Sequence, residues 1–362
     1  MTVVILQQLG LQAEARGYSS TTAEKEYKMT EDTSLLILRQ IRETWHYVDG
    51  TVPRGDHDDK LRYNMGPRWF KNSCAIDSAL FCAIMLDAGR IQVDQISPAQ
   101  LACLGQPAGA LRRIVSKPWG VLSQTQRDGL RDVLADALTH TDPRRFPRHS
   151  PHSIDEVLKI CFDRLPQLSF TGVKAHICCN DELTIKGSQS ATREIGFYLQ
   201  RPRENMSVQD VLQSMLSRRA PKHKIPCDDS GCCTGPRFSI RLILDRMPPI
   251  LLTYALAPIS EKENKTFQLF KRLELIYYTT RGEQTIRYSP LGCVIILDWG
   301  HFVVRWRTVE DGQEQIIHYD GMTSSKATKV KGWWAGLGSC ARSTKMGSRS
   351  GSGVVAAFYR KV

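Results

Sequence analysis

A cysteine stands at the start of a helical segment. In the stretch FKNSCAIDSALFC, Asn72 and Ser73 are residue types that begin helices, and Cys74 falls in the first turn that would follow. Unpaired backbone N–H groups and the positive end of the helix dipole favour a thiolate there, which makes the cysteine a competent nucleophile. The alternative is that Cys74 is a small buried apolar residue like Cys82, which lies further along the same segment.

A histidine and an aspartate flank a predicted hairpin far downstream. In GHFVVRWRTVEDGQEQIIHYDGM, two stretches of alternating polarity are separated by a typical turn sequence at 310–312. The turn lies midway between His301 and Asp320, so strand pairing brings them to neighbouring rungs within side-chain reach. Such a carboxylate holds the imidazole tautomer while the other ring nitrogen faces a thiol. The alternative is a surface pair, but the order Cys74, His301, Asp320 is that of a papain-like cysteine hydrolase.

Helical periodicity comes first along the chain, and β-type alternation follows. We expect a mostly buried helix from Cys74 to Leu86, further helices over 124–139 and 153–164, and one that Ser207 caps. From Phe238 onward most segments alternate as strands do: FSIRLIL, PPILLTYAL, FKRLELIYY, GCVIIL, HFVVRWR, QIIHY and VVAAFYRKV. This order predicts an α+β fold with an antiparallel sheet.

The composition is that of a folded globular protein. The 362 residues include 41% hydrophobic and 24% charged ones, which excludes disordered, collagenous and coiled-coil classes. The 49 basic and 37 acidic side chains give a net charge of +12, which favours acidic partners. No segment approaches the ~18 apolar residues of a membrane span, and the first residues lack a signal-peptide pattern. We therefore expect no membrane association and a cytoplasmic or nuclear location. Eleven cysteines in a long chain favour catalysis or metal binding over a disulfide framework.

Several segments together resemble the ubiquitin-specific proteases and their cylindromatosis-type relatives. NSCAIDSALFC is similar to the cysteine box of that family, and LGCVIILDWGHFVVRWR with HYDGM is similar to its histidine box and acidic residue. SVQDVLQSML, RMPPILLTYAL and VVAAFYRKV resemble further family segments in the same order. The resemblance covers about residues 64–362.

The resemblance implies a deubiquitinating peptidase with a papain-like fold of helical thumb, antiparallel β palm and β-finger insertion. It implies a thumb at 56–165, a finger insertion at 166–245 and a β-rich palm at 246–362. Because the first residues are polar and weakly patterned, we expect residues 1–55 to be an N-terminal extension that is partly disordered. Cys74 would attack the C-terminal Gly carbonyl of ubiquitin or a related modifier. His301 would deprotonate the thiol and later protonate the leaving lysine amine, and Asp320 would orient His301. No cofactor is needed for this catalysis.

The cysteine box departs from the family at two positions. The asparagine that usually lies five residues before the cysteine, and helps to bind the oxyanion, is replaced by Trp69, and Ala75 stands where an aromatic residue is common. We expect Asn72 and the backbone N–H of Cys74 to be the oxyanion donors. The alternative for Asn72 is a helix cap only.

Cysteine and histidine residues form two clusters in the predicted finger. The family has two C-x-x-C pairs here, whereas this chain has HICC at 176–179 and CDDSGCC at 227–233. Thiolate and imidazole ligands favour tetrahedral zinc. We expect one structural zinc site with the ligands His176, Cys179, Cys227 and Cys232. The alternative is a degenerate finger with free thiols.

A loop without acidic residues connects the last two predicted strands. Residues 323–353 are rich in glycine, serine and basic side chains, and they include Trp333 and Trp334. We expect the loop to tune the choice of acidic substrates through its positive charge, and the alternative is a mobile surface loop. We expect the two tryptophans to pack locally against the sheet, and the alternative is that they cover the cleft or bind an acidic substrate.

Two other functions compete with a peptidase that acts on ubiquitin or ubiquitinated proteins. The first is a catalytically inactive ubiquitin-binding module of the same fold, which Trp69 at the oxyanion position favours. The second is a basic nucleic-acid binder with a zinc ribbon, but basic residues interleaved with aromatic ones are not evident, so we expect no nucleic-acid partner.

Overall fold

The computed structural model describes residues 65–86, 106–115, 117, 119, 122–163, 165, 167–177, 183–184, 192–199, 206–216, 239–297, 300–310, 313–335 and 352–362. The predicted N-terminal extension at 1–55 lies outside these residues. The helices are α3 (Cys74–Met85), α5 (Gln106–Val115), α6 (Gln124–Thr141), α7 (Ile154–Cys161), α8 (Val208–Leu216) and α9 (Glu261–Phe267). Apart from α5 and the short α9, these are the segments that helical periodicity predicts.

The strands follow the predicted order, with most of them in the second half of the chain. Those before residue 245 in sequence are β1 (Ser169–Ile177), β2 (Leu183–Thr184), β3 (Thr192–Ile195), β4 (Phe197–Leu199) and β5 (Ser239–Leu244). The later ones are β6 (Ile250–Ile259), β7 (Leu273–Thr279), β8 (Gly282–Leu297), β9 (His301–Glu310), β10 (Gln313–Tyr319), β11 (Thr328–Val330) and β12 (Gly353–Lys361).

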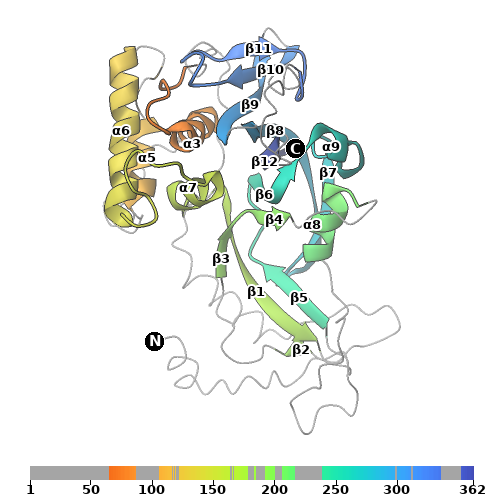
Figure 1. Ribbon diagram of the computed structural model, residues 1–362. Coiled ribbons are helices and arrows are strands. Elements are labelled where there is room, and N and C mark those ends of the chain that lie inside the picture. Colours follow the sequence, from red (N-terminus) through yellow and green to blue (C-terminus); the bar gives the residue numbers. More distant parts are fainter. Residues whose placement is uncertain are drawn as a thin grey trace, which may run out of the picture.

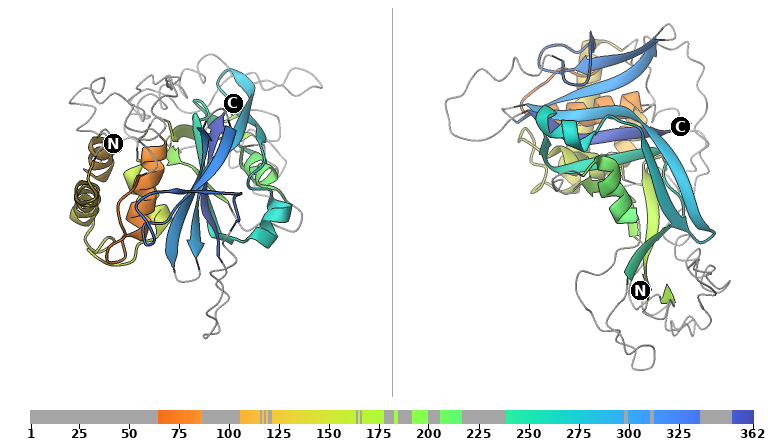
Figure 2. Two further views of the ribbon diagram at one scale, coloured as in Figure 1. Left: turned by 90° about the horizontal axis from the view of Figure 1, so that it is seen from above. Right: turned by 90° about the vertical axis from the view of Figure 1, so that its right-hand side faces the viewer.

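The strands of the described residues join in one sheet with helices on both sides (Figure 1). Its main path runs β11-β10-β9-β8-β7-β5-β1-β2, and β12 pairs with both β8 and β6. Most pairs are antiparallel, as expected for an α+β fold, while β4–β6 and β5–β7 are parallel. Seen from above, α3, α5, α6 and α7 lie on one side of the sheet and α8 and α9 on the other (Figure 2).

Two hydrophobic clusters fill the layers. The first joins α3, α5, α6 and α7 to one face of the sheet, where Phe302, Val304 and Trp306 of β9 are buried. The second joins α8 and the end of α9 to the other face, where Val303 of β9 is buried. Alternate residues of β9 therefore enter opposite layers, as the pleat of a strand requires. His301 lies two residues before Val303 at the start of β9, so the two residues lie on the same face of the sheet.

Local sequence signals set several element ends. Ser123 caps α6 in a capping box with Gln126, and Ser260 caps α9 in the same way with Glu263. The Ser207 hydroxyl accepts a hydrogen bond from the Asp210 backbone N–H at 3.2 Å, which confirms the predicted cap of α8. Among the described residues, no helix combines the length and apolar character that crossing a membrane requires.

Candidate active site

Cys74 is the first residue of α3, and Ser73 is its N-cap residue. Its thiol is half-buried and lies 3.9 Å from the carbonyl oxygen of Gly300, to which it can donate a hydrogen bond. The other cysteines of the described residues, Cys82, Cys161 and Cys293, are fully buried. Cys74 therefore differs from the apolar core cysteines in the way that a nucleophile requires, because a reactive thiol must be reached by substrate.

The sheet brings His301 and Asp320 together. His301 begins β9, Asp320 directly follows β10, and the Nε2 atom of His301 lies 2.8 Å from Oδ1 of Asp320. The β9–β10 register pairs Tyr319 with Val304, which places Asp320 beside Val303, two positions from His301 on the same face. Residues in this diagonal relation remain within side-chain reach. Both side chains are largely buried, with exposed fractions of 13% and 12%.

The electrostatics of the pair favour a charged imidazole. Burial alone would lower the pKa of His301, but hydrogen bonding and charge interactions with Asp320 and Cys74 raise it from 6.5 to about 9. Cys74 is among the groups that raise this pKa, and its thiol lies 3.9 Å from the carbonyl oxygen of Gly300, the residue before His301, so the thiol is near the imidazole. Nε2 is hydrogen-bonded to Asp320, so Nδ1 is the ring nitrogen that can interact with the thiol. Nδ1 is buried and has no hydrogen-bond partner among the described residues.

Asp320 is held as a carboxylate. Burial by itself would raise its pKa, yet the hydrogen bond and charge of His301 and the backbone N–H of Met322 at 2.9 Å together lower it. His318 lies close by, and burial together with the positive charge of Arg305 lowers its pKa to about 4. His318 is therefore neutral at physiological pH, so it does not compete with His301 as a cation beside Asp320. Sequence patterns give no sign of His318, which occupies an ordinary strand position.

The segment before α3 is tied to the strand that ends at Asp320. The backbone N–H of Trp69 donates to the carbonyl of Gly321 at 2.9 Å, and the hydroxyl of Tyr319 donates to the carbonyl of Pro67 at 2.6 Å. Gly66 approaches the Tyr319 ring so closely that a Cβ atom there would lie 2.5 Å from it. These contacts fix the start of α3 relative to Asp320. They join residues far apart in sequence, and no local pattern predicts them.

A tight turn immediately precedes the cysteine. The Ser73 N–H donates to the Phe70 carbonyl at 3.1 Å, while Lys71 and Asn72 adopt left-handed φ values of 42° and 66°. Two positive φ angles between hydrogen-bonded ends are typical of a type I′ turn. Left-handed backbone is unfavourable by about 1–2 kcal/mol for a residue with a side chain, so other contacts must hold this turn. The N-cap residue is Ser73, so Asn72 is not the helix cap.

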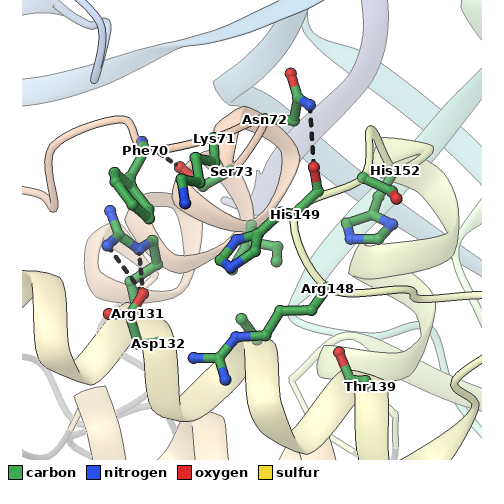
Figure 3. A pocket seen from close by; sticks show the side chains of 13 residues that line it. Phe70, Lys71, Asn72, Ser73, Arg131, Asp132, Thr139, Arg148, His149 and His152 are labelled. Atoms are coloured by element: carbon green, nitrogen blue, oxygen red, sulfur yellow. Dashed lines mark hydrogen bonds and ion pairs between the residues drawn. The ribbon is translucent and has the colours of Figure 1, made fainter.

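The side chain of Asn72 is directed away from α3. Its Nδ2 donates to the backbone carbonyl of His149 at 3.0 Å, on the connection between α6 and α7 (Figure 3). One N–H of the amide is thus in use, and the second has no hydrogen-bond partner among the described residues. The role of Asn72 as an oxyanion donor stays a prediction.

An open hollow adjoins the turn, between α6 and the connection that carries His149 (Figure 3). Phe70 forms part of its wall, with the ammonium of Lys71 5.0 Å from the ring centroid. Two arginines also line it, but Arg131 is paired with Asp132 at 2.9 Å and Arg148 with Asp136 at 3.1 Å. Its arginine charges are therefore compensated, and the lining does not specify a ligand.

The predicted zinc ligands cannot be assembled from the described residues. Cys179, Cys227 and Cys232 lie outside them, and of His176 only the backbone is described, in β1. Within the described part of the chain, His, Cys, Asp and Glu side chains form no group of three that could hold a metal ion. The register pairs Ile177 with Ser239, so the two segments that carry the predicted ligands leave the sheet at adjacent strand ends. Zinc binding stays a prediction.

The first part of the acid-free loop packs against the sheet. Trp333 stacks on Phe270 with ring centroids 4.4 Å apart, and Trp334 meets the same ring edge-on at 5.9 Å. The buried guanidinium of Arg305 donates to the carbonyl of Gly332 at 2.8 Å and also to that of Ala335. The two tryptophans thus pack locally, which is the expected arrangement, and they do not cover the cleft. Residues 336–351 lie outside the described part of the chain.

Comparison with known proteins identifies the fold. No protein-family model matches the sequence, and no curated protein matches it with statistical significance. Solved structures are similar: the SAGA DUB module bound to monoubiquitin and the SAGA Ubp8/Sgf11/Sus1/Sgf73 DUB module bound to ubiquitin aldehyde. Each match has a TM-score of 0.58 and 12% sequence identity, and covers 93% of this chain and 77% of the matched chain. This chain therefore has the fold of a chain in that module.

Proposed function

We propose that this protein is a deubiquitinating cysteine peptidase that hydrolyses the bond after the C-terminal Gly of ubiquitin. The observation that carries the proposal is the hydrogen bond of 2.8 Å between His301 and Asp320, together with the Cys74 thiol at the start of α3, which lies 3.9 Å from the carbonyl oxygen of Gly300, the residue before His301. This is the arrangement that a cysteine, histidine and carboxylate need for nucleophilic catalysis. The similar fold of a chain in a module bound to ubiquitin supports the choice of substrate.

Each residue of the proposed triad has one task. Before attack, the proton of the Cys74 thiol resides on Nδ1 of His301, which gives an imidazolium beside a thiolate, and the thiolate adds to the Gly carbonyl carbon to give a tetrahedral oxyanion. When the carbonyl re-forms, the C–N bond breaks, and the imidazolium gives its proton to the leaving lysine amine. Water, deprotonated by the same imidazole, then adds to the thioester and releases the carboxylate and the thiol. Asp320 keeps the imidazole oriented and stabilises its charged form throughout.

The oxyanion would be stabilised by donors in front of α3. The backbone N–H of Cys74 is among the first-turn groups that a helix leaves without an internal partner. The second donor in the proposal is Asn72, whose amide retains one N–H beyond its bond to His149. Removal of one such donor typically lowers turnover about 100- to 1000-fold.

The arrangement of elements suits a thumb, a palm and a β-finger. The helices of the proposed thumb, 56–165, lie on one side of the sheet, and β9 and β10 of the proposed palm, 246–362, carry His301 and Asp320 (Figure 1). β1 and β5 extend from this body within the proposed finger, 166–245, where a structural zinc held by His176, Cys179, Cys227 and Cys232 would join the strand ends. We also propose a cylindromatosis-type relationship, because the cysteine box NSCAIDSALFC resembles that of these enzymes. Ubiquitinated proteins of the cytoplasm or nucleus are the proposed partners.

A second candidate is an inactive ubiquitin-binding module of the same fold. Trp69 in place of an asparagine favours it, because this residue contributes only its backbone N–H to the described hydrogen bonds near the site. Both functions require ubiquitin binding, but only the peptidase would hydrolyse a ubiquitin conjugate.

Turnover of a ubiquitin–coumarin conjugate tests the proposal. The wild-type chain should release coumarin, Cys74→Ala should release none, and both should bind ubiquitin with the same affinity by calorimetry. Turnover that persists in Cys74→Ala would exclude Cys74 as the nucleophile. Binding by wild type without any turnover would favour the inactive module.

A further inference from the structure

A single carboxyl is buried inside the helix that begins with the proposed nucleophile. Asp77 is the only charged residue of α3, in the sequence CAIDSALFCAIM, and its exposed fraction is 1%. Its Oδ2 atom accepts a hydrogen bond of 2.5 Å from the hydroxyl of Ser73, one turn earlier. Its Oδ1 atom is buried without a hydrogen-bond partner among the described residues. A buried polar group of this kind is rare in a helix core and needs an explanation.

Ser73 connects Asp77 to the turn in front of the nucleophile. The Ser73 hydroxyl accepts a hydrogen bond of 2.9 Å from the Phe70 N–H, and the Ser73 N–H donates to the Phe70 carbonyl at 3.1 Å. The two bonds close the turn from both sides, and between them lie the left-handed residues Lys71 and Asn72. Strained backbone of this kind persists only where surrounding contacts determine it.

We propose that Asp77 is a positioning residue that acts through the Ser73 hydroxyl to hold the 70–73 turn in its reactive geometry. The turn ends at the backbone N–H of Cys74 and carries the Asn72 amide, which are the two proposed oxyanion donors. A displacement of the turn would move both donors, while the surfaces available to bind ubiquitin would stay in place. The effect on turnover rests on the proposed function, but the geometry of the turn does not.

The surroundings of Asp77 favour its neutral form. Burial raises its pKa to about 8, against the smaller lowering effects of the Ser73 hydrogen bond and the charge of Arg131. Three further groups interact with it electrostatically, two carboxylates of α6 and a buried phenol of β10: Asp128, Asp132 and Tyr319. The acid is therefore mostly protonated at pH 7. An asparagine has the same shape and is also neutral, so it is the conservative replacement.

Four variants separate a positioning role from a general role in folding. Asp77→Ala and Ser73→Ala should each lower kcat for the ubiquitin–coumarin conjugate by about 5- to 100-fold, the range expected from one buried hydrogen bond. KM should change less than twofold. The double variant should be no slower than the slower single variant, because both changes remove one connection. Asp77→Asn should retain at least a third of wild-type kcat.

The pH profile provides an independent test. Above about pH 8 the wild-type carboxyl ionises in a buried position, so kcat should fall there. In Asp77→Asn this fall should move towards pH 9, where His301 loses its proton. Asp136→Asn is the matched control, because this carboxylate lies on α6 with 54% of its side chain exposed. It should leave both kcat and the pH profile unchanged.

A readout without ubiquitin keeps this inference separate from the proposed function. The rate at which iodoacetamide alkylates Cys74 in the full chain depends on the geometry of the turn, even if the protein does not hydrolyse ubiquitin conjugates. The melting temperature of each variant is measured alongside, to detect any general loss of folding. Slower alkylation in both single variants without a further decrease in the double variant supports the inference. Additive effects, or a loss in Asp77→Asn as large as that in Asp77→Ala, would overturn it.

Discussion

The charge of Asp320 should decide the protonation state of His301. Replacement by alanine removes the hydrogen bond of 2.8 Å and the negative charge but leaves the imidazole buried, and burial lowers the histidine pKa. The pKa of His301 should therefore fall from about 9 towards 6.5, by less than the whole difference because Cys74 also raises it. This difference of about 2.5 pH units corresponds to about 3 kcal/mol of stabilisation of the imidazolium, or at most about 300-fold in rate. Both side chains are largely buried, so solvent screening is small.

We expect kcat at pH 7 to fall about 30- to 300-fold in Asp320→Ala, as the change in the histidine pKa implies. The fall should be smaller in Asp320→Asn, which retains an acceptor oxygen for the imidazole N–H. An NMR titration of labelled His301 measures the pKa, and hydrolysis of the ubiquitin–coumarin conjugate measures kcat. Glu314→Gln is the control, because this carboxylate of β10 is 67% exposed and pairs with Arg307. A His301 pKa that stays near 9 in Asp320→Ala, with kcat within twofold of wild type, would refute this reasoning.

The charge interactions also link the site to stability. The pKa of His301 is raised in the folded state. The pair therefore contributes its full stabilisation below about pH 6.5, the pKa of a histidine in the unfolded chain. This contribution is lost as the pH rises through about 9.

Three further predictions concern the surroundings of the site. Tyr319→Phe should lower the free energy of unfolding by about 1–2 kcal/mol in denaturant titrations, because the buried Pro67 carbonyl loses its hydrogen bond; an unchanged value would mean that the contact does not hold the start of α3. Elemental analysis of protein purified without chelators should find about one zinc per chain, and none in a variant with Cys179, Cys227 and Cys232 replaced by serine; metal-free wild type would contradict the site. Six basic side chains of the acid-free loop can be neutralised: Lys326, Lys329, Lys331, Arg342, Lys345 and Arg349. Their neutralisation should slow association with acidic substrates at low salt and leave hydrolysis of the ubiquitin–coumarin conjugate unchanged. An equal loss of activity on both substrates at every ionic strength would exclude charge steering.

Local patterns predict the elements that carry the proposed triad. The apolar spacing after Cys74 and the alternation around the turn at 310–312 are strong signals, and the turn position alone places His301 near Asp320. The helix α5 is not apparent from sequence, since its first half contains Pro107 and Gly109, both poor helix formers. Its second half carries Leu111, Ile114 and Val115 at helical spacing, and they pack in the first hydrophobic cluster, but this apolar run is too short to predict a helix by itself.

Contacts between distant segments could not be predicted. The bond between Tyr319 and Pro67 joins residues 252 positions apart, and the one between Asn72 and His149 joins residues 77 positions apart. Asp77 gives a partial signal, as a charged residue in an otherwise apolar helix, but its partner Ser73 resembles an ordinary cap in sequence. Such contacts depend on the tertiary arrangement of the whole fold, and a single sequence carries no local record of them.

Covalent capture by ubiquitin with a C-terminal propargyl amide tests most directly whether Cys74 is the nucleophile of a deubiquitinase. The probe presents an electrophile where the scissile carbonyl would lie, and Cys82, Cys161 and Cys293 are fully buried. Intact mass should show one added ubiquitin, peptide mapping should place it on Cys74, and Cys74→Ala should show no adduct. An adduct on another cysteine, or ubiquitin binding by wild type without any adduct, would contradict a peptidase that uses Cys74.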